Sequence, residues 1–286
     1  GLGDLLHEAG IKADPINDPE MRRKRLAYLT KMTSKGSTPF LYVMGHHELY
    51  SWVYDDNKNI VFKYDNQTGN ESLPRRNVFG CLNSHTKYIQ IHYDKEQTNS
   101  PGAIISNYYY IDCDNEKKRV ICLNTCSYDA IAIDDRQVEW LKAVLNSTPS
   151  GYGVIVFGHV AIVPYLNKSD ISGVSWKNYS LIIQAMNNYV SAGGLVLAYI
   201  HGHTHFDNVA WYSENNEYSC KFPCISICCD LPHKKTNIDV EYGFPTSYER
   251  KIGNLNEYCL DFMSVTNNTI RIIRFGCGNS RYINVI

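Results

Sequence analysis

The chain alternates short apolar runs with polar segments, and its apolar runs have the length of buried strands. Runs of four to eight apolar residues bounded by glycine or polar residues favour strands over helices. Such runs occur at residues 40–44, 154–157, 195–199 and 222–229. Residues 104–111 and 119–123 predict two further strands, joined as a hairpin by the polar turn 112–118.

Other segments place their apolar residues at helical spacing. The polar segment 134–137 opens a helix in which Val138, Leu141 and Leu145 fall on one face. Residues 176–190 predict a second helix of this kind, which the glycines at 193–194 would end. An earlier helix is expected from residue 18 towards residue 36, because aspartate and proline stand at its start.

The order of these elements predicts an α/β fold with a terminal β-hairpin at about residues 256–276. No internal repeat or low-complexity linker interrupts the order, so residues 1–286 are expected to form a single domain. Residues 51–100 are polar, irregular and rich in tyrosine and asparagine, and they predict no element. The tyrosines there and at 108–110 could stack on a base or a sugar, or could simply pack.

Composition narrows the class of protein. With 286 residues and 44% hydrophobic content, the chain can bury a large core. A formal net charge of −1 with dispersed charges argues against broad electrostatic binding to nucleic acid or to an anionic membrane. No apolar run reaches transmembrane length, and the first residues do not form a signal peptide, so a soluble protein is expected.

The ten cysteines are expected to be structural thiols. Several of them, including Cys122, Cys224, Cys228 and Cys229, lie inside apolar runs. No CxxC pair occurs, which argues against a cysteine zinc site. Their placement favours small buried hydrophobic residues in a reducing compartment over disulfides.

Candidate chemistry lies where predicted strands end. The stretch 201–205 reads His-Gly-His-Thr-His, and its three alternate imidazoles could converge on one or two cations. A polar surface turn is the alternative interpretation of this stretch alone. Gly-His-His-Glu at 45–48 and Gly158-His159 also follow apolar runs. In open α/β sheets, ligands collect at the carboxyl ends of strands.

Gly3-Asp4, the 45–48 stretch, Gly158-His159 and the 202–205 stretch together resemble the calcineurin-like metallophosphoesterases. The family pattern reads DxH, GDxx[DE], GNH[DE], GH and GHxH, and the resemblance covers nearly the whole chain. Within the family, the continuation from His203 to Asn208 and the Arg-Phe-Gly-Cys-Gly stretch at 274–278 are most similar to phage tail-associated phosphoesterases. The localisation stays open between a cytoplasmic and a virion-associated protein. The resemblance implies an αββα sandwich, in which two mixed β-sheets pack face to face with helices outside.

The resemblance also implies a dinuclear metal site. Asp4 matches the carboxylate that bridges the two divalent ions, His159 and His203 match ligands of one ion, and His205 matches a ligand of the other. Oxygen and imidazole ligands suit Mn, Fe, Zn or Ni without choosing among them. The implied partners are phosphate esters, either small molecules or polymers.

His47 matches the histidine that faces the substrate phosphate, and Glu48 matches the acid beside it. The implied reaction is hydrolysis of a phosphate ester, most simply a phosphodiester, by a metal-activated hydroxide. His47 would serve as the general acid that protonates the departing alkoxide.

The chain departs from the family pattern in two ways. His46 stands where the family has an asparagine metal ligand, and an imidazole there can serve as a ligand or turn away. The DxH motif and its strand have no match, so we expect an upstream segment of about 30–50 residues to complete the fold and the first metal position. Upstream sequence without Asp-x-His would contradict this hypothesis. The departures also permit an alternative: a catalytically inactive module that binds a cell-surface polymer or serves as a structural part of a phage tail.

Overall fold

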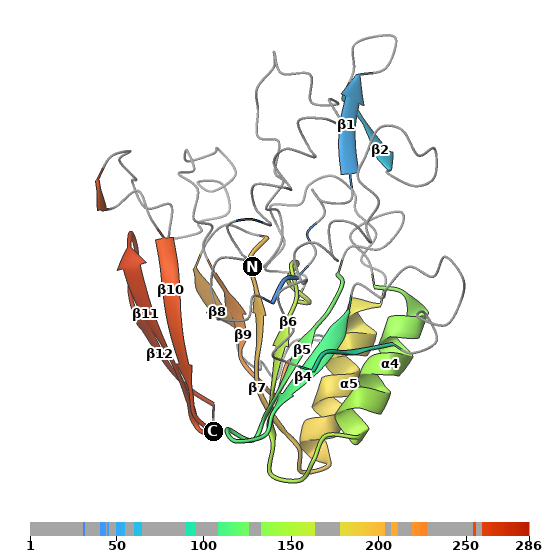
Figure 1. Ribbon diagram of the computed structural model, residues 1–286, viewed down its shortest axis with the longest axis vertical. Coiled ribbons are helices and arrows are strands. Elements are labelled where there is room, and N and C mark those ends of the chain that lie inside the picture. Colours follow the sequence, from blue (N-terminus) through green and yellow to red (C-terminus); the bar gives the residue numbers. More distant parts are fainter. Residues whose placement is uncertain are drawn as a thin grey trace.

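A computed structural model describes residues 31, 41–43, 45, 50–54, 60–64, 90–94, 108–125, 133–163, 178–203, 207–210, 219–227, 254–255 and 259–285. Its centre is a seven-stranded sheet with the order β3-β4-β5-β6-β7-β9-β8 (Figure 1). The strands of this sheet are β3 (His92–Tyr93), β4 (Tyr109–Cys113), β5 (Lys118–Cys122), β6 (Gly153–Phe157), β7 (Leu195–His201), β8 (Asn208–Ala210) and β9 (Cys224–Ser226).

The sheet is mixed. Strands β5, β6, β7 and β9 run parallel to one another, whereas β3, β4 and β8 pair antiparallel with their neighbours. Helix α4 (Asp135–Asn146) connects β5 to β6, and helix α5 (Tyr179–Ser191) connects β6 to β7. Because parallel strands joined by crossover helices all end at the same sheet edge, the segments that follow β5, β6, β7 and β9 meet there.

Both helices cover the same face of this sheet (Figure 1). The predicted helix start at residues 134–137 is confirmed, and the Asp134 carboxylate caps it by accepting a hydrogen bond of 2.7 Å from the backbone N–H of Gln137. The predicted apolar face of α4 is buried, with Val138, Leu141 and Leu145 in the main core. The α/β class predicted from the sequence is therefore confirmed.

A second, three-stranded sheet lies against the opposite face. Its strands β10 (Cys259–Val265), β11 (Thr269–Gly276) and β12 (Arg281–Asn284) pair antiparallel in this order. A separate core joins the two sheets, and it includes Ile155, Leu197, Ile200, Ile225, Ile270, Ile272 and Ile283. The described residues thus form a helix layer, a mixed sheet and an antiparallel sheet. The predicted terminal hairpin corresponds to β10 and β11, and β12 adds a strand that its sequence had not indicated.

The outer face of the three-stranded sheet is apolar. Side chains that alternate along the three strands remain at least two-fifths exposed, namely Leu260, Phe262, Ile273, Phe275 and Tyr282. The register places Leu260 opposite Phe275 and Phe262 opposite Ile273, so these side chains share one face. Among the described residues, no hydrophobic cluster includes them.

The prediction of a strand at residues 40–44 is wrong for residues 41–43, which are the ones that the structure describes. Residues 41–43 are largely buried, as expected, but they do not belong to a strand. The backbone N–H and carbonyl of Tyr42 each form a 3.0 Å hydrogen bond with the Tyr109 hydroxyl. A side chain thus satisfies backbone groups that a neighbouring strand would otherwise occupy.

The tyrosine-rich segments contribute structure where the sequence had predicted none. Strands β1 (Tyr50–Tyr54) and β2 (Ile60–Tyr64) form an antiparallel pair, and β3 lies at the edge of the large sheet. Tyr108 and Tyr109 are almost completely buried, so packing is their role. The hairpin predicted around residues 112–118 is present as β4 and β5, with a tighter turn at 114–117.

Arg119 is the main polar anchor of the helix layer. Its guanidinium forms two 2.7 Å hydrogen bonds with Asp112 and one of 2.7 Å with the carbonyl of Val144 in α4. It also stacks over the Tyr110 ring at 4.2 Å. The side chain is only 4% exposed, so loss of the cation would leave the Asp112 carboxylate without its ion pair.

We therefore expect Arg119→Met to reduce the free energy of unfolding by about 3 kcal/mol, measured by chemical denaturation. The matched control is Lys142→Met, which removes an ion pair of similar length, 2.7 Å to Glu139, on the exposed surface of α4. Exposed pairs contribute about 0–1 kcal/mol, so this control should change stability little. Equal losses in the two variants would contradict the anchoring role of Arg119.

Candidate metal centre

Two histidines meet where adjacent parallel strands end. His159 follows β6 and His203 follows β7, and these strands are neighbours in the sheet. Nδ1 of His203 lies 3.1 Å from Nε2 of His159, with the ring planes inclined by 66°. The sequence placed both residues at strand ends and assigned them to one ion, and the structure brings them together.

The backbone fixes the two histidine segments relative to each other. The carbonyl of His159 accepts hydrogen bonds from the N–H groups of Gly202 (3.2 Å) and His203 (2.9 Å). One residue earlier, the N–H of Gly158 donates to the carbonyl of Ile200 at 3.0 Å. These bonds continue the β6–β7 ladder beyond the strands, so the backbones that carry the two imidazoles are held against each other.

Thr125, which follows β5, supports the same site. Its buried hydroxyl accepts hydrogen bonds from the N–H groups of His159 (3.2 Å) and Val160 (3.1 Å). The neighbouring Asn124 backbone exchanges two hydrogen bonds with the buried side chain of Gln137, at 2.8 and 2.7 Å. Sequence reasoning missed these supports. In the sequence, Gln137 stands at the third helical position after Asp134. Its burial, which requires hydrogen-bond partners for the amide, is visible only in the structure.

The Tyr199 side chain comes so close to the backbone at residue 158 that only glycine fits there. A Cβ atom at this position would overlap the Tyr199 hydroxyl and lie 2.8 Å from Cζ of the same ring. Tyr199 cannot easily withdraw, because its hydroxyl donates a 2.6 Å hydrogen bond to the carbonyl of Val160. The glycine before His159 therefore lets the backbone pass between Tyr199 and Thr125.

The separation of the two ring nitrogens fits a hydrogen bond between the imidazoles and equally fits two ligands of one metal ion. Nitrogens that each lie about 2.0–2.1 Å from an ion, at an angle between about 90° and 110°, are separated by about 2.9–3.4 Å. The observed 3.1 Å lies in this range. His159 is 2% exposed and His203 is half-buried, so the pair is sheltered on one side and accessible on the other. The donor set therefore fits a divalent ion of the borderline class.

His201 does not join the pair. It is the last residue of β7 and is completely buried, and neither ring nitrogen has a hydrogen-bond partner in the part of the chain that the structure describes. Burial, together with the nearby His203 and His159, lowers the pKa of His201 to about 3. This imidazole is therefore neutral at physiological pH. Of the two described members of the alternating trio, only His203 contacts His159.

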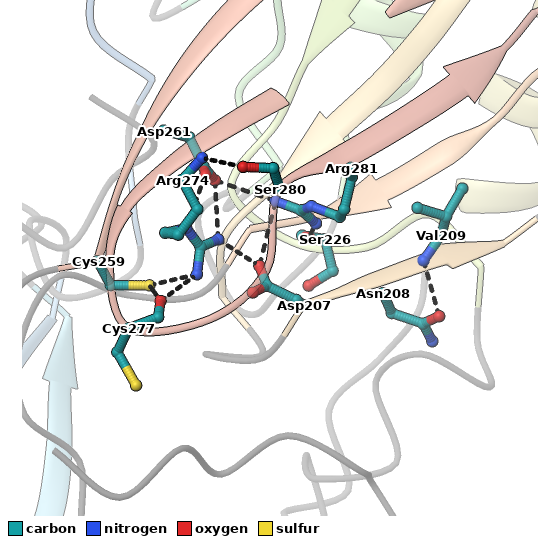
Figure 2. A network of polar contacts seen from close by, with 10 residues as sticks. All are labelled: Asp207, Asn208, Val209, Ser226, Cys259, Asp261, Arg274, Cys277, Ser280 and Arg281. Carbon is teal, nitrogen blue, oxygen red and sulfur yellow. Dashed lines mark hydrogen bonds and ion pairs between the residues drawn. The ribbon is translucent and has the colours of Figure 1, made fainter. Parts of the chain in front are cut away.

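Four charged side chains behind the histidine segment form a buried network, which Figure 2 shows. Arg274 donates to Asp207 at 2.8 Å and to both oxygens of Asp261 at 2.7 and 3.0 Å. Arg281 lies 3.2 Å from Asp207 and 3.0 Å from Asp261. Burial alone would lower the pKa of Arg274, but its hydrogen bonds to the two carboxylates raise it overall, so it stays a cation. The network was not predicted from the sequence.

The described cysteines are buried thiols, with the exception of the half-buried Cys113. Burial raises the pKa of Cys122 to about 11, which keeps it protonated and unreactive. The prediction of structural thiols is confirmed for these residues. Cys228 and Cys229 lie outside the described residues.

The remaining predicted site residues, Asp4, His46, His47, Glu48 and His205, also lie outside the described residues. Within the part of the chain that is described, no group of three or more His, Cys, Asp or Glu side chains forms a metal cluster. Of the predicted site residues, His159 and His203 are thus the two whose positions the structure describes.

Comparisons with known proteins find distant similarity to solved structures. No protein-family model matches the sequence, and no curated protein matches it significantly. Among solved structures, a dimetal phosphatase from Danio rerio matches with a TM-score of 0.36 and 14% sequence identity. The matched region covers 54% of this chain and 39% of the phosphatase chain, so this chain spans less than half of that protein. None of the described helices is long and apolar enough to cross a membrane.

Proposed function

We propose that this chain belongs to a metal-dependent enzyme that hydrolyses phosphate esters, with phosphodiesters as the preferred class. The observation that carries the proposal is the 3.1 Å contact between His159 and His203 at the carboxyl ends of two adjacent parallel strands. The ordered glycine–histidine motifs of the sequence support it. The narrower placement among phage tail-associated enzymes stays a prediction from the sequence.

His159 and His203 would hold one divalent ion, and Asp4, His205 and His46 would supply the other protein ligands. Such ions, when bound, neutralise phosphate oxygens and lower the pKa of water towards neutrality. The chain itself contributes the position of the two imidazoles, which Thr125 and the backbone of residues 202–203 hold in place. The nearby His201 is buried and neutral, so it brings no positive charge that would repel a bound cation.

His47 is proposed as the general acid. An imidazolium near the phosphate can donate its proton to the oxygen of the departing alkoxide, which would otherwise leave as an unstable anion. Proton donation of this kind contributes about 10²–10⁴-fold to a rate. This magnitude makes the role of His47 testable by a single substitution.

The test measures turnover of bis-p-nitrophenyl phosphate with added Mn by the unaltered chain and by His47→Ala. We expect the variant to lose about 10²–10⁴-fold in kcat, while its metal content stays the same. p-Nitrophenyl phosphate, assayed alongside, should be hydrolysed more slowly if diesters are preferred. Equal turnover of the diester by both proteins would remove His47 from the mechanism. Absence of turnover by the protein extended with its expected upstream segment, in the presence of bound Mn, would favour the inactive binding module instead.

A further inference from the structure

The described ends of the segment that carries His203 lie on opposite sides of strand β9. Residues 202–207 connect β7 to β8, and β9 lies between these two strands. His201 and Asn208 both pair with Ser226 of β9, from opposite sides. The two described ends of this segment are therefore about two strand separations, roughly 10 Å, apart.

The first end of this loop is held by the backbone bonds from Gly202 and His203 to the His159 carbonyl. The other end is Asp207, whose side chain is 7% exposed. Asp207 accepts a 2.8 Å hydrogen bond from Arg274 and lies 3.2 Å from Arg281. Both arginines belong to the three-stranded sheet, so the second end is tied to a different layer of the fold.

The arginines are themselves firmly held. Arg274, with a side chain 1% exposed, also donates to the carbonyl of Cys277 at 2.8 Å and contacts the Cys259 thiol. Arg281 donates to the carbonyl of Ser226 at 2.7 Å. Asp261, the second carboxylate, belongs to β10 and contacts the same two arginines (Figure 2). Two cations and two anions balance, which makes their burial tolerable.

We propose that Asp207 is a positioning residue of the metal centre: its ion pairs with Arg274 and Arg281 anchor the histidine loop so that His203 stays against His159. The expected effect on metal binding rests on the proposed function. The anchoring of His203 concerns the metal-free chain and does not depend on that function. Loss of these ion pairs removes the tie between Asp207 and the three-stranded sheet, while the pairing of Asn208 with Ser226 remains. His203 then samples other positions, and an ion loses a pre-organised ligand.

Asp207 and Asp261 form a matched pair of test positions. Both carboxylates are 7% exposed, both contact Arg274 and Arg281, and only Asp207 lies in the histidine loop. Asp207→Asn and Asp261→Asn each remove one negative charge and keep the side-chain shape. A purely structural network predicts equal effects of the two changes, whereas the anchoring role predicts unequal ones.

The first measurement is amide hydrogen exchange of the metal-free protein in the peptide that spans residues 202–207. Exchange at Gly202 and His203 should be at least about tenfold faster in Asp207→Asn than in Asp261→Asn, because local opening exposes these two amides. Equal exchange in the two variants would overturn the proposal. If either variant fails to fold, the charge-preserving pair Asp207→Glu and Asp261→Glu replaces it, with the same expected difference.

The second measurement is the affinity for Co²⁺, followed by its visible absorption. We expect Asp207→Asn to weaken binding about tenfold and Asp261→Asn less than about threefold, since outer partners of metal ligands typically contribute 10–100-fold. Equal losses would again overturn the positioning role. A chain that binds no Co²⁺ in any form would refute the proposed function, and hydrogen exchange would then still decide the anchoring.

Discussion

Replacement of His159 or His203 by alanine is expected to reduce Mn-supported hydrolysis of a phosphodiester by more than about a hundredfold, because even outer partners of metal ligands contribute 10–100-fold. Each change removes one of two imidazole nitrogens that lie 3.1 Å apart. The remaining imidazole cannot hold an ion with comparable strength. The measurements are kcat/KM for the diester and the number of Mn ions bound per chain at equilibrium.

The control for these variants is His92→Ala. His92 lies in β3 and stacks on Tyr110 with ring centroids 4.6 Å apart. Strands β4 and β5 separate β3 from the histidine pair. Loss of this stacked imidazole should leave metal content and turnover close to those of the unaltered chain. Undiminished activity of both His159→Ala and His203→Ala would contradict the metal centre.

Substitution of Gly158 by alanine is expected to lower the free energy of unfolding by about 3 kcal/mol or more, at the upper end of the usual cost of overpacking. The added Cβ would overlap the Tyr199 hydroxyl and approach Cγ2 of Thr125 to 2.9 Å. Both neighbours are held by hydrogen bonds to the backbone around His159. The strain should therefore appear in chemical denaturation and also in weaker Mn binding.

The double variant Gly158→Ala/Tyr199→Phe tests the physical reason for this loss. Removal of the hydroxyl eliminates the worst overlap, although the ring carbon Cζ and Thr125 still crowd the new methyl group. We expect part of the lost stability to return, beyond the effect of Tyr199→Phe alone. A Gly158→Ala variant as stable as the unaltered chain would show that the backbone can move aside.

Much of the layered core could be predicted, because each predicted strand or helix carried a periodic apolar pattern. The contact between His159 and His203 could be anticipated because both residues follow strands of the same parallel sheet. The support of the site could not be predicted. Thr125, Gln137 and Arg274 act through contacts between segments far apart in sequence, and no local pattern encodes such contacts.

The misassigned and missed strands have similar causes. The apolar stretch at 40–44 has a strand-like composition, but the Tyr109 hydroxyl binds backbone groups of Tyr42. The stretch at 281–284 is short and mixes charged with apolar residues, so its pairing with β11 depends on the sheet that is already present. Tertiary context decided both segments against their local pattern.

The link between Asp207 and Arg274 also has a consequence for biosynthesis. The two residues are 67 positions apart, and a ribosome that adds roughly 5–20 residues per second needs roughly 3–13 s to pass from one to the other. Throughout this interval the nascent chain already contains His159 and His203, but Arg274 and Arg281, which pair with Asp207, have not yet been added. Under the proposed function, metal binding in the final geometry would therefore wait until the last strands have emerged from the exit tunnel.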